Sequence, residues 1–286
     1  MESYDEMLTR FIRQGLAEDV GEGDHTSNAC IPSTRISKAR LLVKEDGVIS
    51  GVEVARRIFK EVAPAADVEV LITDGQVVAP GDVAFYVTCP TRVLLMAERL
   101  VLNTMQRMSG IASLTALYLQ EVEGFPVKLL DTRKTTPGMR FLEKEAVRHG
   151  GGHNYRSGLY DWIMIKDNHI DASGGIDRAI DSVHQYLAKA GRSLPITIEV
   201  RNLVELQQVL DHGGVTRIMM DNFEIPILRE AIALVDGTFE TEASGGITLH
   251  NIRSYAETGV QYISSGALTH SAGSIDMSLK IVRSEG

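Results

Sequence analysis

The chain has 286 residues, 44% hydrophobic and 23% charged, with a formal net charge of −9 at pH 7. This size and composition suit one large α/β domain or two domains with a substantial core. An acidic chain without a broad basic face is unsuited to nucleic acid. No apolar run approaches the roughly eighteen residues of a membrane span. The acidic first residues lack a signal-peptide layout, and the two cysteines are far apart, so we expect a cytoplasmic protein.

The first third of the sequence mixes helical and antiparallel-strand patterns. Helical spacing covers residues 4–18 and 51–62, and strand signals cover 39–43, 48–49, 68–72 and 83–87. An apolar helix is predicted over 91–123, with a break near Ser109-Gly110. Glu98 and Arg99 lie inside that helix, either as an ion pair or with Arg99 reaching an anion site across a subunit interface. We predict an α+β domain over residues 1–110.

From residue 128 the pattern changes to short Val/Ile/Met-rich runs that end in polar residues. These runs are 128–132, 162–167, 196–200, 217–222, 238–244 and 262–266, with helical stretches between them. The last four follow each other at about 20 residues, the length of one βα unit. This rhythm predicts a parallel sheet in a closed or nearly closed α/β barrel over residues 111–270. A terminal helix is expected over 276–282, within a tail (271–286) that packs on the N-terminal domain.

Residues 131–169 hold seven Lys or Arg against five Asp or Glu, a net charge of +2 in a chain whose remainder carries −11. Three glycines, Gly150, Gly151 and Gly152, lie within this segment. Local positive charge around glycines on an acidic protein predicts a pocket for a small polyanion.

Polar residues follow all six predicted barrel strands, where α/β barrels build their active sites. They are Arg133-Lys134, Lys166-Asp167-Asn168-His169, Glu199, Asp221-Asn222, Ser244-Gly245-Gly246 and Ser264-Ser265-Gly266.

The last two strand ends are rich in glycine and match the usual phosphate position of a barrel. Glycines at Gly245, Gly246 and Gly266 allow backbone N–H groups to approach an anion, and the next helix would point its positive end toward it. Ser244, Ser265 and His270 could hold the same phosphate. Two tight turns without a ligand are the alternative.

Glu199 and Asp221 end neighbouring predicted strands. One or two carboxylates together with phosphate oxygens are how Mg²⁺ is usually held. The same carboxylates could stabilise positive charge on a sugar carbon. Asp221 could instead only cap the following helix.

Three other features allow rival interpretations. Lys166 ends an apolar strand, where a Schiff-base enzyme would keep its nucleophile. His149 and His153 raise a metal site, although the glycines between them break the helix that would align them. Arg140, Lys144 and Arg148 share a helical face that is solvated by default, or that leans Arg140 and Lys144 toward the pocket.

Several runs together carry a resemblance that extends almost over the whole chain. They are Glu98-Arg99, Leu102-Asn103, Ser109-Gly110-Ile111-Ala112, Asp131-Thr132-Arg133-Lys134-Thr135-Thr136-Pro137-Gly138, Gly150-Gly151-Gly152 with Asn154, Lys166-Asp167-Asn168-His169 and Ser244-Gly245-Gly246-Ile247. In this order they closely resemble the quinolinate phosphoribosyltransferase family, also called nicotinate-nucleotide pyrophosphorylase (carboxylating). The opening Glu18-Asp19, Gly23-Asp24 and Thr26-Ser27 are similar to the same family.

The resemblance implies an N-terminal α+β open-faced sandwich joined to an incomplete (β/α) barrel. It implies transfer of a phosphoribosyl group from phosphoribosyl pyrophosphate to quinolinate with Mg²⁺, giving nicotinate mononucleotide, pyrophosphate and CO₂ in de novo NAD biosynthesis. It also implies a homodimer or an assembly of dimers, in which the partner's N-terminal part completes each site.

By the same resemblance, Arg133, Arg156, Lys166 and the partner's Arg99 would bind the two carboxylates of quinolinate. Lys134 would face the pyrophosphate and act in catalysis with Glu199 and Asp221, which would hold Mg²⁺ and the ribose. The glycine turns would take the 5′-phosphate.

The chain departs from the family pattern at Tyr155, where the family usually has His before the arginine. Tyrosine adds no charge near neutral pH but can donate one hydrogen bond, and we place it among the substrate-binding residues. His153 is a possible substitute. A smaller departure is Arg201, where relatives often carry an acid.

Other functions remain open on the sequence. They are a molybdenum-operon relative with a different base substrate, a Schiff-base lyase using Lys166, and a non-catalytic protein that binds phosphoribosyl pyrophosphate.

Overall fold

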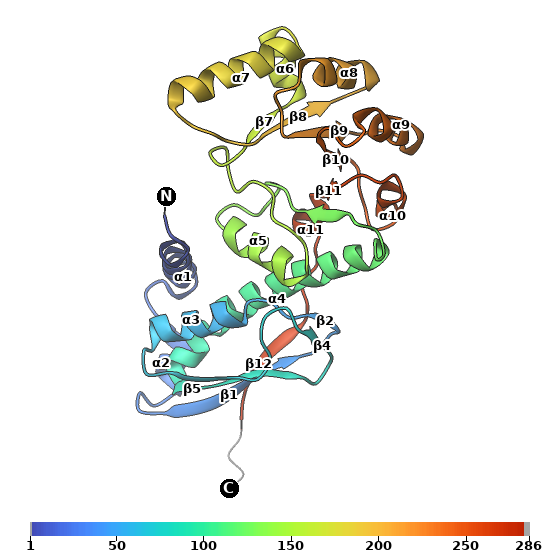
Figure 1. Cartoon of the computed structure of the whole chain (residues 1–286). Coiled ribbons are helices and arrows are strands. Elements are labelled where there is room, and N and C mark those ends of the chain that lie inside the picture. The colour runs from blue at the N-terminus through green and yellow to red at the C-terminus, as the bar shows by residue number, and fades with distance from the viewer. Residues whose placement is uncertain (1, 283–286) are drawn as a thin grey trace. The chain divides into compact units, whose positions relative to one another are not determined.

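The structure, a computed structural model, describes residues 2–282. These residues group into two compact units (Figure 1). The first holds residues up to Ala116, Thr135–Gly151 and the chain from Ser271, and the second holds Leu117–Lys134 and Gly152–His270. The two predicted domains are each continuous in sequence and meet between residues 110 and 111. Each compact unit instead combines segments from separate parts of the sequence.

The first unit is built on a four-stranded antiparallel sheet in the order β12-β1-β5-β3. Figure 1 labels β1, β5 and β12 of this sheet. Its strands are β1 (Ile36–Val43), β3 (Asp67–Val70), β5 (Val83–Pro90) and β12 (Met277–Ile281), and β2 (Gly47–Val48) pairs separately with β4 (Val77–Val78). In β1 the buried Ala39, Leu41 and Val43 alternate with more exposed residues. One face of the sheet therefore packs on the core while the other stays open, as expected for an open-faced sandwich.

The helices of this unit are α1 (Tyr4–Val20), α2 (His25–Cys30), α3 (Val52–Val62), α5 (Arg140–His149) and most of α4 (Thr91–Glu121). The predicted break in α4 is wrong, because the helix runs continuously through Ser109 and Gly110. Gly110 is there because the chain passes close by: a Cβ at this position would lie 1.8 Å from the carbonyl oxygen of Gly273. Ser109 is fixed as well, since its Oγ accepts a hydrogen bond from the backbone N–H of Ser50.

The predicted C-terminal helix is also wrong. Residues 277–281 form β12, which pairs antiparallel with β1 and sets Leu279 opposite Leu41. The segment alternates apolar Met277, Leu279 and Ile281 with polar residues, a period of two that favours a strand. It also closes an edge of the sheet that would otherwise expose the backbone groups of β1. The last four residues of the predicted tail lie outside the described residues.

The second unit is a parallel α/β arrangement. Its sheet has six strands in the order β6-β11-β10-β9-β8-β7. They are β6 (Lys128–Leu130), β7 (Ile163–Ile165), β8 (Ile196–Val200), β9 (Arg217–Asp221), β10 (Glu240–Ser244) and β11 (Tyr262–Ser264). The helices are α6 (Asp167–Ser173), α7 (Ile176–Ala190), α8 (Leu203–His212), α9 (Ile225–Val235), α10 (Ile252–Ala256) and α11 (Ala267–His270).

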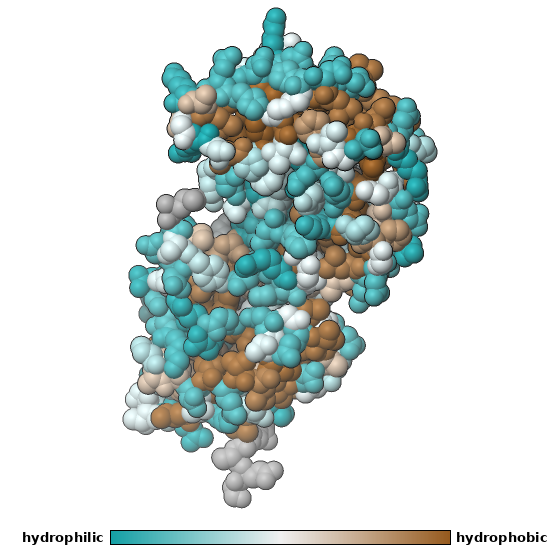
Figure 2. All heavy atoms as spheres, viewed as in Figure 1, coloured by the Kyte–Doolittle hydropathy of each residue, from teal (hydrophilic) through white to brown (hydrophobic). Residues whose placement is uncertain are grey.

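The α/β fold class and the six parallel strands predicted from the sequence are confirmed. All five residues of β8 are buried, which explains why this strand reads as a continuous apolar run. Within residues 2–282, β6 and β7 end the sheet without pairing to each other, consistent with an incomplete barrel. Both units show hydrophobic residues among hydrophilic ones on the face in Figure 2. No helix in the described range is both long and apolar enough to cross a bilayer.

Candidate active site

The carboxyl ends of the parallel strands bring the predicted carboxylates together on the second unit. Asp221 ends β9 and lies opposite Ser244, the last residue of β10. Glu199 is in β8, next to β9, and Lys166 directly follows β7 on the other side. Neighbouring parallel strands end at one edge of a sheet, so these four side chains share one edge.

Glu199 and Lys166 form the central ion pair of this edge. Lys166 Nζ lies 3.7 Å from Glu199 Oε2, and the lysine side chain is 46% exposed while that of the glutamate is 11% exposed. Burial raises the pKa of the Glu199 carboxyl, Lys166 opposes that rise, and the negative charge of Asp221 adds to it. A carboxylate in this position is stabilised by any further cation that arrives beside it.

The same pair of carboxylates fits a magnesium ion. Glu199 Oε2 is buried and accepts no hydrogen bond from the residues that the structure describes. Asp221 is close enough to affect the pKa of Glu199. The described residues contain no cluster of three or more metal-binding side chains. Mg²⁺ is commonly held by only one or two carboxylates together with substrate oxygens, so this donor set suits an ion that arrives with a phosphate.

Arg133 and Arg156 supply positive charge in the second unit. Burial lowers the pKa of the Arg156 guanidinium, and the nearby Arg133 lowers it further. Two guanidinium groups held near one another repel, and that repulsion is relieved when an anion binds between them. Because guanidinium groups bind carboxylates in a bidentate manner, the pair is suited to a dicarboxylate.

Asp131 ties the segments that carry these arginines. It is fully buried. Its Oδ1 accepts a hydrogen bond of 2.8 Å from the backbone N–H of Tyr155, and its Oδ2 accepts one of 2.5 Å from the amide nitrogen of Asn154. The segment leading to Arg156 is thereby fixed to the one that leads to Arg133.

Two glycines after β10 form the first of the predicted phosphate turns. Gly245 and Gly246 both have positive φ, 92° and 59°. Asn222, also at positive φ (56°), donates its backbone N–H to the Ser244 carbonyl and its side-chain amide to Asp221. The turn after β10 and the carboxylate at the end of β9 are thus built as one piece.

The turn after β11 brings together Lys134, Gly266 and His270. A Cβ on Gly266 would lie 2.7 Å from Lys134 Cδ and 3.1 Å from the His270 ring. Thr269 Oγ1 donates a 2.8 Å hydrogen bond to the Lys134 carbonyl. Ser265 is buried, and its hydroxyl donates to the Ile247 carbonyl, so in this structure it joins the two glycine turns.

The helices after these turns contribute less than the sequence suggested. α11 has four residues, and α10 starts only at Ile252, well beyond Gly246. Helices this short have small macrodipoles. An anion at these turns would depend on backbone N–H groups and on the Lys134 ammonium.

Tyr155 is turned into the interior and away from the exposed strand ends. Its side chain is buried, its hydroxyl lies 2.6 Å from Thr197 Oγ1, and its ring meets Trp162 edge to face. The prediction that Tyr155 contacts substrate is not supported by this position. His153, its proposed substitute, is exposed and bridges β6 through its backbone.

The rival interpretations receive little support. A Schiff-base lysine needs a neutral amine, usually in an apolar pocket, whereas Lys166 is exposed beside a carboxylate. His149 Nδ1 lies 2.8 Å from the Ser50 hydroxyl in the first unit, and the described residues place no metal cluster around it. Arg201, the smaller departure, pairs with Asp171 and Glu205 at the surface.

The remaining predicted cations lie in the first unit. Arg99 is exposed on α4 and forms no salt bridge among the described residues, which argues against the ion pair with Glu98. Arg148 is exposed, as predicted for a solvated face of α5. Lys144 is buried instead, and Arg140 donates a hydrogen bond to the Thr135 hydroxyl.

Glu143 is an anchor that the sequence did not single out. It is fully buried in the first unit, accepts two hydrogen bonds from Arg107, and accepts both the N–H and the hydroxyl of Thr136. Within the first unit, this contact fixes Thr136 to α5 and to Arg107 of α4. The signal available in the sequence was a glutamate that shares a helix face with the apolar Ala146 and Val147, three and four residues further on.

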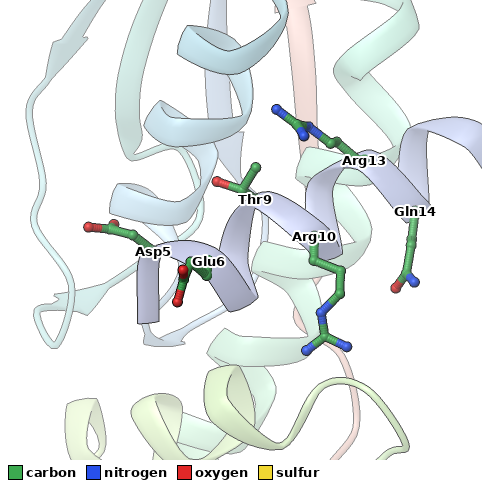
Figure 3. Close-up of a pocket in the computed structure, with 6 residues that line it drawn as sticks. All are labelled: Asp5, Glu6, Thr9, Arg10, Arg13 and Gln14. Atoms are coloured by element: carbon green, nitrogen blue, oxygen red, sulfur yellow. The ribbon is translucent and has the colours of Figure 1, made fainter. Parts of the chain in front are cut away.

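A shallow groove along α1 offers no comparable chemistry (Figure 3). Its two cations are already paired, Arg10 with Glu2 and Arg13 with Glu61. It is lined by Asp5, Glu6, Thr9, Arg10, Arg13 and Gln14.

Parallel strands ending in carboxylates, cations and glycine turns define an α/β protein whose site receives anionic ligands. Comparison with known proteins makes this specific. The chain belongs to the quinolinate phosphoribosyl transferase family: residues 24–109 match the sequence model of its N-terminal domain, and residues 111–280 match that of its C-terminal domain.

Individual relatives agree over nearly the whole chain. The chain is 45% identical over 294 aligned residues to quinolinate phosphoribosyltransferase [decarboxylating] 1 of Nicotiana glauca, covering 98% of this chain and 83% of the relative. It is 44% identical to the chloroplastic nicotinate-nucleotide pyrophosphorylase [carboxylating] of Arabidopsis thaliana, with the same coverage. The crystal structure of NadC from Streptococcus pyogenes superposes with a TM-score of 0.91 at 35% identity, covering 99% of this chain and all of that one.

Proposed function

We propose that this protein transfers the phosphoribosyl group of phosphoribosyl pyrophosphate to quinolinate and releases CO₂, forming nicotinate mononucleotide and pyrophosphate in NAD biosynthesis. The observation that carries the proposal is the cluster at the strand ends, where Lys166 pairs with Glu199 and Arg133 is near enough to Arg156 to lower its pKa, in a chain of this family. Quinolinate is a dianion, and two guanidinium groups with the Lys166 ammonium nearby match its charge.

The carboxylates serve the other substrate. Glu199 and Asp221 would hold Mg²⁺ with the pyrophosphate and face the ribose, where they stabilise positive charge on the sugar carbon. When bound, the metal neutralises charge on the leaving pyrophosphate. Lys134 would face the same pyrophosphate. The turns at Ser244, Gly245, Gly246 and Ser265, Gly266 with His270 would receive the 5′-phosphate.

The chemistry then needs orientation more than a nucleophilic side chain. The ring nitrogen forms a bond to the sugar carbon as the bond to pyrophosphate breaks, which makes the ring cationic. The adjacent carboxylate leaves as CO₂, its bonding electrons remain on the ring carbon as a stabilised ylide, and a proton from solvent completes the product. Fixed positive charge and alignment of the two substrates are what the protein supplies.

The direct test is an assay with quinolinate, phosphoribosyl pyrophosphate and Mg²⁺ that follows both nicotinate mononucleotide and CO₂. Equal amounts of both products support the proposal. Product formation from another base without CO₂ would favour a molybdenum-operon relative, and borohydride trapping of substrate on Lys166 would favour a lyase. Binding without turnover would leave a non-catalytic role.

The pH dependence of activity is expected to report Glu199. Its pKa is raised above the ordinary value of 4.5 by burial, and it must be ionised to face a cation. As the pH falls through this raised pKa, the carboxylate is protonated and both Mg²⁺ affinity and activity decline. The acid limb of the kcat/KM profile should therefore lie above pH 4.5 and be absent from Glu199→Gln. A limb at 4.5 or below, or one that persists in that variant, would contradict the assignment.

We propose that the enzyme is a homodimer or an assembly of dimers in which Arg99 serves the partner's site. The exposed Arg99 is free of salt bridges within residues 2–282, which leaves its charge available. Arg99→Ala and Arg133→Ala should each be nearly inactive. After subunit exchange between them, random pairing places both arginines at one site in each mixed dimer, restoring about a quarter of wild-type activity. No recovery would mean that Arg99 does not act on the partner.

Location within the cell stays a prediction. The sequence favours a cytoplasmic protein, whereas the Arabidopsis relative is named chloroplastic and a Nicotiana tabacum relative mitochondrial.

A further inference from the structure

The interior of the second unit, below the candidate site, holds a charged residue that the proposed reaction does not use. Side chains alternate along a strand, so Arg217, Met219 and Asp221 of β9 lie on the same face of the sheet. Arg217 is the first residue of that strand, four residues before Asp221. It is only 5% exposed. Because a buried charge is costly without partners, we expect other groups to pair with this guanidinium.

Two glutamates of the neighbouring strand neutralise Arg217. Its Nε and Nη2 donate to Glu240 Oε2 at 2.9 and 2.8 Å, and its Nη1 donates to Glu242 Oε2 at 3.1 Å. The register of the sheet explains this arrangement, because Glu240 lies directly opposite Arg217 and Glu242 lies two residues further on the same face.

Three aromatic rings surround the same guanidinium. Its Cζ lies 3.6 Å from the ring centroid of Tyr262 and 5.2 Å from those of Tyr155 and Trp162. We call Arg217 and these three rings the arginine box. A desolvated guanidinium over aromatic faces is stabilised by cation–π attraction, so the box fixes the position of each ring.

Tyr155 is held in the box at a second point. Its hydroxyl lies 2.6 Å from Thr197 Oγ1, which also accepts a 2.8 Å hydrogen bond from Trp162 Nε1. Thr197 lies opposite Arg217 in the sheet register. The phenol is therefore anchored both by its ring and by its oxygen.

The backbone of Tyr155 connects this anchor to the candidate site. Its N–H donates to Asp131, two residues before Arg133, and the next residue in the chain is Arg156. A shift of the Tyr155 ring would move the segment that carries Arg156 and release one hydrogen bond of the segment that carries Arg133.

We propose that Tyr155 is a positioning residue for quinolinate, which acts from below the site by holding Arg156 through the arginine box and Thr197, without contacting the substrate. This inference rests on the proposed function, in which Arg156 binds a carboxylate of quinolinate.

The box also accounts for a tyrosine at this position. Burial and the nearby Glu242 raise the pKa of the Tyr155 phenol, so it remains neutral beside the glutamates. A large neutral ring with one hydroxyl fills the space and satisfies Thr197.

The test compares Tyr155→Phe, Thr197→Val and Thr197→Ser in the full chain. Tyr155→Phe keeps the ring and removes the contacts of the hydroxyl. Thr197→Val removes the contact with Tyr155 from the other side, together with the hydrogen bond that Thr197 accepts from Trp162. Each is expected to raise the KM for quinolinate about three- to tenfold, with kcat and the KM for phosphoribosyl pyrophosphate within about twofold, since both lose the hydrogen bond between Tyr155 and Thr197. The double variant should be no worse than the poorer single variant, and Thr197→Ser should rescue the KM.

The outcomes separate this inference from the proposed function. Arg156→Ala must raise the KM for quinolinate if that side chain binds the diacid, and an unchanged value would overturn the proposed site. If Arg156→Ala has this effect but both hydroxyl-deleting variants keep the wild-type KM, only the positioning role is wrong. Equal loss for both substrates, in step with a lower melting temperature, would reduce Tyr155 to a structural role. If Tyr155→Phe fails to fold, Thr197→Val alone decides.

Discussion

Replacing Arg133 with alanine is expected to lower kcat/KM for quinolinate by about 10²- to 10³-fold while the protein stays folded. The loss follows from charge: Arg133 and Arg156 lie close enough for one to lower the pKa of the other, and together they would meet a dianion. Two charge-assisted hydrogen bonds are worth about 3–4 kcal/mol, which corresponds to this range of rates. Steady-state kinetics with each substrate varied in turn, together with a melting curve, measure the effect.

Two further variants show whether the loss is specific to the guanidinium. Arg133→Lys keeps the charge but not the bidentate geometry, so it should recover only part of the activity. Arg178→Ala removes an exposed arginine from α7 and should leave the kinetics unchanged. Full activity in Arg133→Ala would remove this side chain from the site and leave the proposed binding of the diacid without its main support.

The strand ends were predictable because parallel strands have a strong local signal. A parallel strand is largely buried, as all five residues of β8 are, so it reads as a short apolar run, and the polar residues at its carboxyl end mark the edge where sites form. Glu199, the next-to-last residue of β8, and Asp221, the last residue of β9, lie at such ends. These two residues lie close together because their strands are parallel neighbours in the sheet, which can be inferred without knowing any side-chain conformation.

Features that depend on distant partners were not predictable in this way. Gly110 reads locally as a helix breaker, yet it sits inside α4 because the backbone at Gly273 approaches it closely. Residues 277–281 alternate as a strand does, but five residues are too few to decide between strand and helix until the edge of β1 is known to need a partner. Helix propensity and short apolar patterns are overridden when tertiary packing supplies the missing contacts.

The arginine box shows the same limit within the candidate site. Arg217 begins an apolar run, and the run alone says nothing about the rings or carboxylates that bury its charge. The family pattern placed Tyr155 next to the substrate, whereas its partners Thr197 and Trp162 lie in the interior. A residue that departs from a family pattern has to be read against its packing, because its neighbours decide which way it points.

Gly245→Ala is expected to cost at least about a hundredfold in kcat/KM and to lower the melting temperature by several degrees. Gly245 has a φ of 92°, which costs an alanine about 1–2 kcal/mol. A Cβ would also lie 2.3 Å from Asn222 Oδ1 and 2.9 Å from Asn222 N. Asn222 would have to move, and with it the hydrogen bonds that it donates to Ser244 and Asp221. The turn and the carboxylate would be displaced together.

A matched glycine separates the steric clash from backbone strain. Gly259 has a similar φ of 86°, but a Cβ there meets no atom within 4 Å, and it lies outside the candidate site. Gly259→Ala should lose only the strain energy and keep its kinetics. If both variants lose the same stability and neither loses activity, then the turn after β10 takes no part in the reaction. If Gly245→Ala is inactive at a temperature where it remains folded, and titration shows weaker binding of phosphoribosyl pyrophosphate, the loss comes from the displaced turn rather than from unfolding, because Gly259→Ala carries the strain without the displacement.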